Sequence, residues 1–254
     1  MSEVSLLKET SVRKPETFIL DAITKFKIFE GDCLDLMPQI PDRYVDCILT
    51  DPPYFLPASH YQTRTQFSRN FADLGILEHF FKDAFREMTR ILKPNGVLYI
   101  FCDGQSYPLF YYHLYPYCKS IRPLIWDKLT SINGFSWRHQ HEIIIFAEMP
   151  DAEPKPSGSG DILKCSAVKV DERQHPAEKP VILLCRLIAK STEKNQIIFD
   201  PFMGSGSTGI ACLKLQRRFI GIDISHDYIE LAKKRLEKFS PQLEMFMKIP
   251  KEEG

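Results

Sequence analysis

The most regular hydrophobic pattern in the chain is a series of short apolar runs, each about as long as one β-strand. Runs of this length, bounded by polar residues, glycine or proline, are typical of strands buried in a parallel sheet. Longer segments with apolar residues at helical spacing lie between some of them. The pattern predicts seven strands, over residues 26–31, 45–50, 97–102, 122–127, 142–147, 196–200 and 218–223.

The clearest helical pattern covers residues 77–92, where eight apolar residues recur at helical spacing. Lys93-Pro-Asn-Gly96 follows this segment and provides a stop signal. Further helices are predicted over residues 106–118, 181–191 and 227–239. With a length of 254 residues, the chain suits one α/β domain with small insertions.

Three segments depart from this pattern. Residues 1–25 are polar apart from Phe18-Ile-Leu20, and we expect an appended arm or a peripheral helix. Residues 148–174 concentrate proline, glycine and serine with a slight excess of acids, so they are predicted to be an insertion or linker outside the sheet. Residues 241–254 are predicted to form a loose tail.

Composition narrows the classes of function. The formal net charge is +0, so nucleic-acid binding would depend on a local basic face and not on bulk charge. The 7 cysteines are odd in number and form no C-x-x-C pair, which favours free thiols in a reducing compartment over disulfides or a metal site. No apolar run approaches the roughly 18 residues of a membrane span, and the N-terminus lacks an apolar signal segment. We therefore expect a soluble cytoplasmic protein.

A glycine-rich stretch, Asp200–Gly209, lies between a predicted strand and a predicted helix. Gly204, Gly206 and Gly209 match the G-x-G-x-x-G spacing, which allows a ligand to approach the backbone N–H groups and the helix N-terminus. The next strand ends at Asp223, where a carboxylate can accept hydrogen bonds from both hydroxyls of a ribose. The pattern favours an adenosine-type ligand, with a plain strand–helix turn as the alternative.

The second informative stretch is Asp51-Pro52-Pro53-Tyr54, at the carboxyl end of a predicted strand. An exocyclic amine on a nucleobase is a poor nucleophile because its lone pair is delocalised into the ring. The Asp51 carboxylate and the Pro52 carbonyl can accept its two hydrogens and free the lone pair, while Tyr54 can stack on the base. Alone, such a tetrapeptide is more often a turn. Beside the glycine-rich unit it predicts catalysis by these four residues.

These motifs and their order resemble the β group of amino-methylating DNA methyltransferases, which modify adenine N6 or cytosine N4. The resemblance covers roughly residues 26–240 and includes His175-Pro-Ala-Glu-Lys-Pro180, which is similar to the family motif that precedes the cofactor loop. Trp126-Asp-Lys128 and the run from Arg138 to Glu142-Ile-Ile-Ile-Phe are similar to later motifs of the catalytic half.

The resemblance implies a seven-stranded, mostly parallel, Rossmann-like methyltransferase sheet. Helices would cover both faces, the motif order would be circularly permuted, and the last strand would be antiparallel. It divides the chain into an N-terminal arm (1–25), the catalytic half of the domain (26–147), a short target-recognition insertion (148–174), the cofactor-binding half of the same domain (175–240) and a tail (241–254).

S-adenosylmethionine is the implied cofactor, and no metal is expected. Asp223 would hold the ribose, and Lys179, with His175 close by, would lie near the methionine end. The alternatives are helix capping and surface charge for His175 and Lys179, and a turn acid for Asp32. The implied cofactor residues are Asp32, His175, Lys179, Asp200, Pro201, Phe202, Gly204, Ser205, Gly206 and Asp223.

Double-stranded DNA is the implied partner, with the target base flipped out and held by Tyr54. Residues 55–75, which include Arg64 and Arg69 among aromatic residues, are predicted to cover that base and contact phosphates; a solvated disordered loop is the alternative. Trp137 and Arg138 are further candidates for DNA contact, although Trp137 suits a core position equally well. The resemblance also leaves open a homodimer and a cognate restriction endonuclease, and it implies no membrane partner.

D-P-P-Y favours adenine N6, because S-P-P-Y is commoner in the cytosine-N4 enzymes of the family. The predicted function is site-specific adenine-N6 methylation of DNA, with cytosine N4 as the alternative and an RNA amine as a weaker one. A nicotinamide oxidoreductase shares the glycine pattern but leaves D-P-P-Y unexplained. A DNA-binding regulator with an inactive cofactor site conflicts with the intact Asp51.

Overall fold

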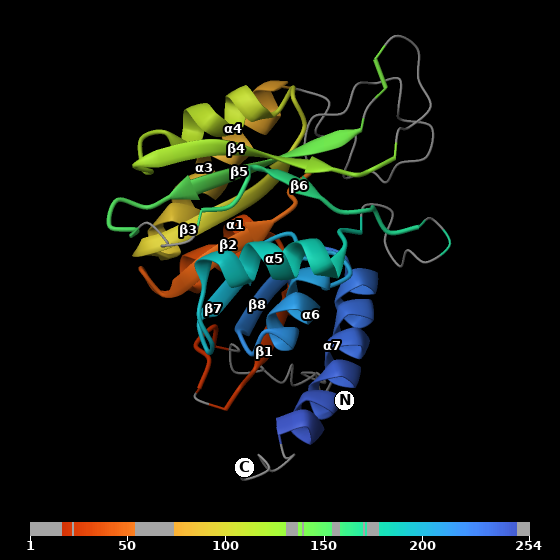
Figure 1. Cartoon of the computed structure of the whole chain (residues 1–254). Helices are drawn as coiled ribbons and strands as arrows, with labels where there is room; N and C mark the ends of the chain where they lie inside the picture. The colour runs from red at the N-terminus through yellow and green to blue at the C-terminus, as the bar shows by residue number, and fades with distance from the viewer. Residues whose placement is uncertain are drawn as a thin grey trace, which may run out of the picture.

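The computed structural model describes residues 17–21, 23–53, 74–130, 137–138, 140–153, 158–169, 171 and 178–247. These residues form one eight-stranded sheet with the order β1-β8-β7-β2-β3-β5-β4-β6 (Figure 1). The strands are β1 (Phe26–Glu30), β2 (Val45–Thr50), β3 (Leu92–Cys102), β4 (Ser120–Asp127), β5 (His141–Glu148), β6 (Ile162–Lys164), β7 (Ile197–Asp200) and β8 (Arg218–Asp223). The last two strands in the chain thus lie inside the sheet, as the permuted order predicts.

Strand direction follows from how the strands are connected. β1, β8, β7, β2 and β3 are mutually parallel. β5 is antiparallel to β3 and to β4, and in the described part of the chain it is the one strand with this direction. The expectation of an antiparallel last strand therefore needs correction. The helical crossover between β7 and β8 returns the chain to the end of the sheet at which β7 begins, so β8 runs parallel to β7.

The eighth strand is a second correction. β6 lies within residues 148–174, which were expected to lie outside the sheet, and it pairs in parallel with β4 at the register Ile125↔Ile162. Trp126 Nε1 donates to the carbonyl of Cys165 at 2.7 Å and fixes this segment against the sheet. A strand of three residues is too short to produce an alternating pattern, so the proline- and glycine-rich composition dominated the prediction.

Helices cover both faces of the sheet, as predicted (Figure 1). Because side chains alternate along a strand, neighbouring residues of β2 enter different cores. Ile48 packs in the core beneath the first group of helices, and Leu49 packs in the core beneath the second. The first group is α1 (Cys33–Leu36), the 3₁₀ turn η1 (Met37–Gln39), α3 (Leu74–Ile91) and α4 (Tyr107–Leu114), and the second is α5 (Val181–Ser191), α6 (Ser207–Lys214) and α7 (His226–Met247).

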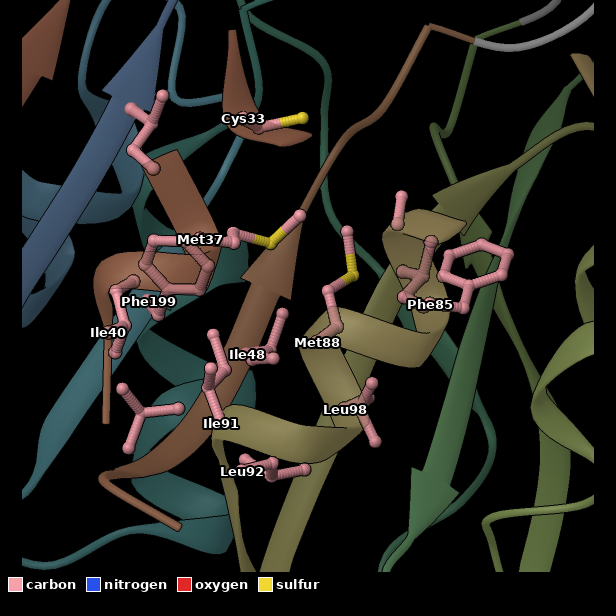
Figure 2. Packing of buried hydrophobic residues seen from close by; sticks show 14 of the residues in the cluster. Cys33, Met37, Ile40, Ile48, Phe85, Met88, Ile91, Leu92, Leu98 and Phe199 are labelled. Carbon is pink, nitrogen blue, oxygen red and sulfur yellow. The ribbon is translucent and has the colours of Figure 1, made fainter. Parts of the chain in front are cut away.

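The first core connects the two halves of the chain. Figure 2 shows Met88 and Ile91 of α3 beside Ile48 and Leu98 of the central strands. Phe199 of β7, from the C-terminal half, belongs to the same cluster and is fully buried. The two halves therefore share one hydrophobic interior and behave as parts of one domain.

The chain ends differ in detail from expectation. In the predicted arm, Phe18 is buried and stacks on Phe29 of β1 with ring centroids 3.9 Å apart. At the other end, α7 continues to Met247, so the first part of the predicted tail is helical, and residues 248–254 lie outside the described residues. Within the described ranges, no helix is both long and apolar enough to cross a bilayer.

Candidate active site

Four of the predicted site carboxylates lie at the carboxyl ends of neighbouring strands. Asp32 follows β1, Asp223 ends β8, Asp200 ends β7 and Asp51 follows β2. These strands are adjacent and parallel, so their carboxyl ends share one edge of the sheet. Open α/β sheets bind ligands at this edge. The fold thus places the glycine-rich stretch beside the D-P-P-Y stretch, although about 150 residues separate them in the sequence.

Asp200 ties these two stretches together. Its Oδ1 accepts a hydrogen bond from Thr50 Oγ1 at 2.6 Å and another from the Phe202 N–H at 3.1 Å. The Asp200 side chain is buried, and burial raises its pKa to about 7, against the lowering effect of its hydrogen bonds to Thr50 and Thr208. Asp200 thus holds the end of β2 against the glycine-rich turn.

The glycine spacing has a steric cause in this structure. Gly204 and Gly206 have φ angles of 50° and 79°, which other residues rarely adopt. A Cβ on Gly206 would lie 3.0 Å from the Cβ of Ala232 in α7. A Cβ on Gly209 would lie 2.8 Å from Leu236 Cδ2. The glycines therefore serve both the turn and the close packing of α6 on α7.

Asp223 and Asp32 support the same edge of the sheet. Asp223 accepts the N–H of Gly204 at 2.8 Å with one oxygen and the N–H of Ser225 at 2.9 Å with the other. Burial raises the pKa of the Asp223 carboxyl, and these hydrogen bonds oppose the rise. Asp32 caps α1 by accepting the N–H of Leu34 at 2.9 Å, which is the role of a turn acid. The backbone N–H of Ile224 also hydrogen-bonds to Asp223, and a carboxylate has about four lone-pair sites, so room remains for a further donor.

Lys179 lies against Asp51. Its Nζ is 2.5 Å from Asp51 Oδ2 and 3.3 Å from Glu142 Oε2, and it also lies over the ring of Phe101, 4.9 Å from the centroid. Glu142 Oε1 in turn accepts from Lys128 Nζ at 2.5 Å. Only 8 % of the Lys179 side chain is exposed, so the interpretation of Lys179 as a surface charge is wrong.

Each of these charged groups shifts the pKa of its neighbours toward the ionised form or away from it. Burial raises the pKa of Asp51, and Lys179 opposes that rise. Burial would lower the pKa of Lys179, but Asp51 and Glu142 outweigh burial and raise it. Burial would likewise raise the pKa of Glu142, but Lys179 and Lys128 outweigh it and lower the pKa. Asp51 Oδ1 is buried and, among the described residues, has no hydrogen-bond donor. It is therefore an acceptor suited to an N–H group of a ligand.

Of the other residues predicted for the site, some are exposed, some lie in the glycine-rich turn, and some lie outside the described residues. Trp137 is 96 % exposed, which rules out the core alternative, and Arg138 beside it is also exposed. Pro201 and Ser205 are buried within the turn, and Phe202 contacts the ring of Phe80. The catalytic candidate Tyr54, the loop residues Arg64 and Arg69, and the motif residue His175 lie outside the described residues.

Sequence reasoning did not select Glu142 and Lys128 as site residues. Both lie in stretches already noted as similar to family motifs; Lys128 directly follows β4, and Glu142 is the second residue of β5. Charge at the end of a predicted strand was the available signal. Without knowing that β4 and β5 run beside β3, the sequence does not place these charges near Asp51.

Residues 45–234 match the family model described as DNA methylase, of the N6/N4 type. The chain belongs to the N6/N4 DNA methylase family. The matched range includes both the Asp51 stretch and the glycine-rich turn, so the family assignment rests on the residues that the fold brings together.

This methylase also resembles named relatives. It is 31 % identical over 248 residues to Type II methyltransferase M2.MboI of Moraxella bovis, across 86 % of this chain and 90 % of the relative. It is 29 % identical over 241 residues to Type II methyltransferase M2.LlaDCHI of Lactococcus lactis subsp. cremoris, across 83 % and 89 %.

Solved structures share the fold of this chain. The M1.HpyAVI–SAM complex is 26 % identical, with a TM-score of 0.64 across 83 % of this methylase and 98 % of that chain. PvuII DNA methyltransferase, described as cytosine-N4-specific, has a TM-score of 0.66 across 87 % and 93 % at 13 % identity, which shows a shared fold.

Proposed function

We propose that this DNA methylase methylates adenine N6 in double-stranded DNA, with Asp51, Pro52, Pro53 and Tyr54 as its catalytic residues. S-adenosylmethionine is the cofactor of the enzyme, in keeping with its family and with the bound cofactor of the related M1.HpyAVI complex. The observation that carries the proposal is Asp51 Oδ1, a buried acceptor at the ligand-binding edge of the sheet.

The glycine-rich turn fits an adenosyl ligand. Asp223 lies at the end of β8 and has room to accept from a ribose hydroxyl. Gly204 and Gly206, both at positive φ, allow the tight turn between β7 and α6. Asp32, Pro201, Phe202 and Ser205 complete the proposed pocket. A bound cofactor would supply an electrophilic methyl carbon on a sulfonium centre.

The residues of this chain would act on the amine of the base. Asp51 Oδ1 and the Pro52 carbonyl accept its two hydrogens, which releases the nitrogen lone pair from the ring. The nitrogen would take the methyl group that the cofactor supplies, and the proton that it then loses would pass along its hydrogen bond to Asp51 Oδ1 and from there to solvent. The two acceptors stabilise the charge that develops on nitrogen. Tyr54 would stack on the base, which must leave the duplex to reach Asp51.

Adenine is preferred over cytosine on the basis of D-P-P-Y. The test is to incubate the protein with unmodified duplex DNA and labelled cofactor, digest the DNA and separate the nucleosides. N6-methyl-2′-deoxyadenosine is the expected labelled product. N4-methyl-2′-deoxycytidine as the sole product would overturn the choice of base, and labelled RNA with unlabelled DNA in parallel assays would overturn the choice of substrate.

The names of M2.MboI and M2.LlaDCHI favour a role as the modification enzyme of a type II restriction system. Sequencing of modified bases in DNA from a strain that expresses the protein tests this role. One short motif methylated at nearly every occurrence is expected, and methylation scattered without a motif would contradict it.

A further inference from the structure

We propose that Lys179 and Glu142 are positioning residues for Asp51, with Lys179 holding one carboxylate oxygen and Glu142, itself held by Lys128, holding Lys179. The proposal rests on the proposed catalytic role of Asp51. It assigns to Lys179 a task on the base-binding side of the site, beyond its expected place near the methionine end of the cofactor.

The four side chains form a line of alternating charge. Asp51 Oδ2, Lys179 Nζ and Glu142 Oε2 are separated by 2.5 Å and 3.3 Å, and Lys128 follows at 2.5 Å from Glu142 Oε1. Between 8 % and 22 % of each side chain is exposed, so solvent screens these charges weakly. Each charge has an opposite neighbour, which is what permits four charges at one buried place.

Lys179 is held in this position from its other side as well. The neighbouring Glu178 accepts from Ser207 Oγ at 3.2 Å and from Arg235 at 2.6 Å, and these residues belong to α6 and α7. Pro180, on the other side, is the N-cap of α5 and has a restricted φ. The backbone of Lys179 is therefore anchored to the glycine-rich half of the domain, while its ammonium group reaches the catalytic half.

This contact fixes the orientation of the Asp51 carboxylate. The terminal torsion of an aspartate is broad, so an unheld carboxylate would rotate. With Oδ2 bound to Lys179, Oδ1 remains an acceptor to which none of the described residues donates. The positive charge also favours the ionised carboxylate against burial, and only the ionised form accepts with both oxygens. Within the described part of the chain, the charged and titratable groups around Asp51 are Lys179, Glu142, Lys128, Asp200 and Cys102.

The test is the pH profile of kcat in Lys179→Met. Loss of the cation raises the pKa of Asp51, so the acidic limb of the profile should move upward by about 1 to 3 pH units. At neutral pH kcat should fall about 100-fold, while KM for the cofactor changes little. Lys179→Arg should restore the wild-type limb in part. The matched control is Lys194→Met, at an exposed lysine in a turn, which should leave the profile unchanged.

Glu142→Gln tests whether Glu142 positions Lys179, while the cation beside Asp51 stays in place. Glu142 itself raises the pKa of Asp51, so its removal should lower kcat without moving the acidic limb upward. Thermal melting and cofactor binding show whether Lys179→Met folds. If it does not fold, Glu142→Gln and Lys179→Arg test the positioning of Asp51 instead. Wild-type kcat and pH profile in both, or in Lys179→Met, would overturn the proposal. Asp51→Asn provides the separate check: if it stays fully active, the proposed role of Asp51 fails instead.

Discussion

Burial raises the pKa of two single carboxylates at this site, Asp51 and Asp200. Asp200 is 3 % exposed and Asp51 is enclosed by the ion pairs around it, yet the two have different partners. Asp200 is held by hydroxyl and N–H donors from Thr50 and Phe202, whereas Asp51 has a cation. A cation supports the ionised form more strongly than neutral donors do. The two acids should therefore respond differently to pH.

Asp200 should make the stability of the protein depend on pH. Its folded-state pKa of about 7 exceeds the ordinary value of 3.8, so the folded protein binds this proton more tightly than the unfolded chain does. The associated stability is present below the ordinary value and is lost as the pH rises to about 7. From about pH 5 to about pH 8, wild type should lose about 2 to 3 kcal/mol relative to Asp200→Asn. Urea unfolding at both pH values checks this, and an unchanged difference would contradict it.

At the scale of elements, the glycine-rich turn depends on α7 as much as on its own strand. Arg235 of α7 donates to the carbonyl of Ser205 at 2.8 Å and to Glu178 at 2.6 Å. One side chain therefore ties the turn and the segment before α5 to the same helix. Ala232, about one helical turn before Arg235, lies so close to Gly206 that a Cβ there would be 3.0 Å from the Cβ of Ala232. A change in α7 should thus be felt at the cofactor pocket.

Arg235→Met should weaken cofactor binding by about 10-fold, because Ser205 and Glu178 lose a charged donor. The adjacent Lys234→Met is a matched control, since Lys234 is exposed on the same helix. Calorimetric titration with S-adenosylhomocysteine measures the affinity of both variants. Equal affinities would show that α7 does not position the turn.

Gly206→Ala should lower the free energy of unfolding by about 1 to 2 kcal/mol, because alanine is strained at a φ of 79° and meets Ala232 at 3.0 Å. Gly104→Ala is the control, since a Cβ there has no neighbour within 4 Å. Thermal unfolding of the two variants compares them. A Gly206→Ala protein as stable as the Gly104→Ala protein would refute the steric argument.

At the scale of the whole molecule, one sheet lies between two hydrophobic cores and contributes residues to both. Phe85 of α3 lies in the first core and Trp126 of β4 lies in the second, and both are at most 2 % exposed. Strands such as β2 supply residues to each core, so neither face can be lost alone without exposing the other side of the same strands. Unfolding should therefore be cooperative.

Phe85→Ala should lower the free energy of unfolding by about 3 to 5 kcal/mol. The loss should appear at the same denaturant concentration in tryptophan fluorescence, which reports on buried Trp126 in the other core, and in far-ultraviolet circular dichroism. Trp137 contributes little to the change, because it is 96 % exposed in the folded protein. Separate midpoints for the two signals would mean that the cores unfold independently.

Much of this architecture is present in local patterns. The runs over β1, β2, β5, β7 and β8 were predicted within a residue or two, because buried strands are continuous apolar segments with polar ends. The glycine spacing and the acid of β8 likewise depend on short-range geometry. In contrast, β6 is too short to have a pattern, and β3 begins at Leu92, before the stop signal that ended the predicted helix.

The sequence by itself was enough to propose which stretches bind the cofactor and react, because turn geometry, helix ends and the D-P-P-Y pattern are properties of neighbouring residues. Tertiary structure alone decided which charges face Asp51. The order of β2, β3, β5 and β4 brings Lys128 and Glu142 close to Asp51. Lys179 reaches the same place from the segment before α5, in the other half of the chain. An ion pair between distant residues leaves no periodic trace in a sequence, since its partners are selected by the sheet and not by spacing along the chain.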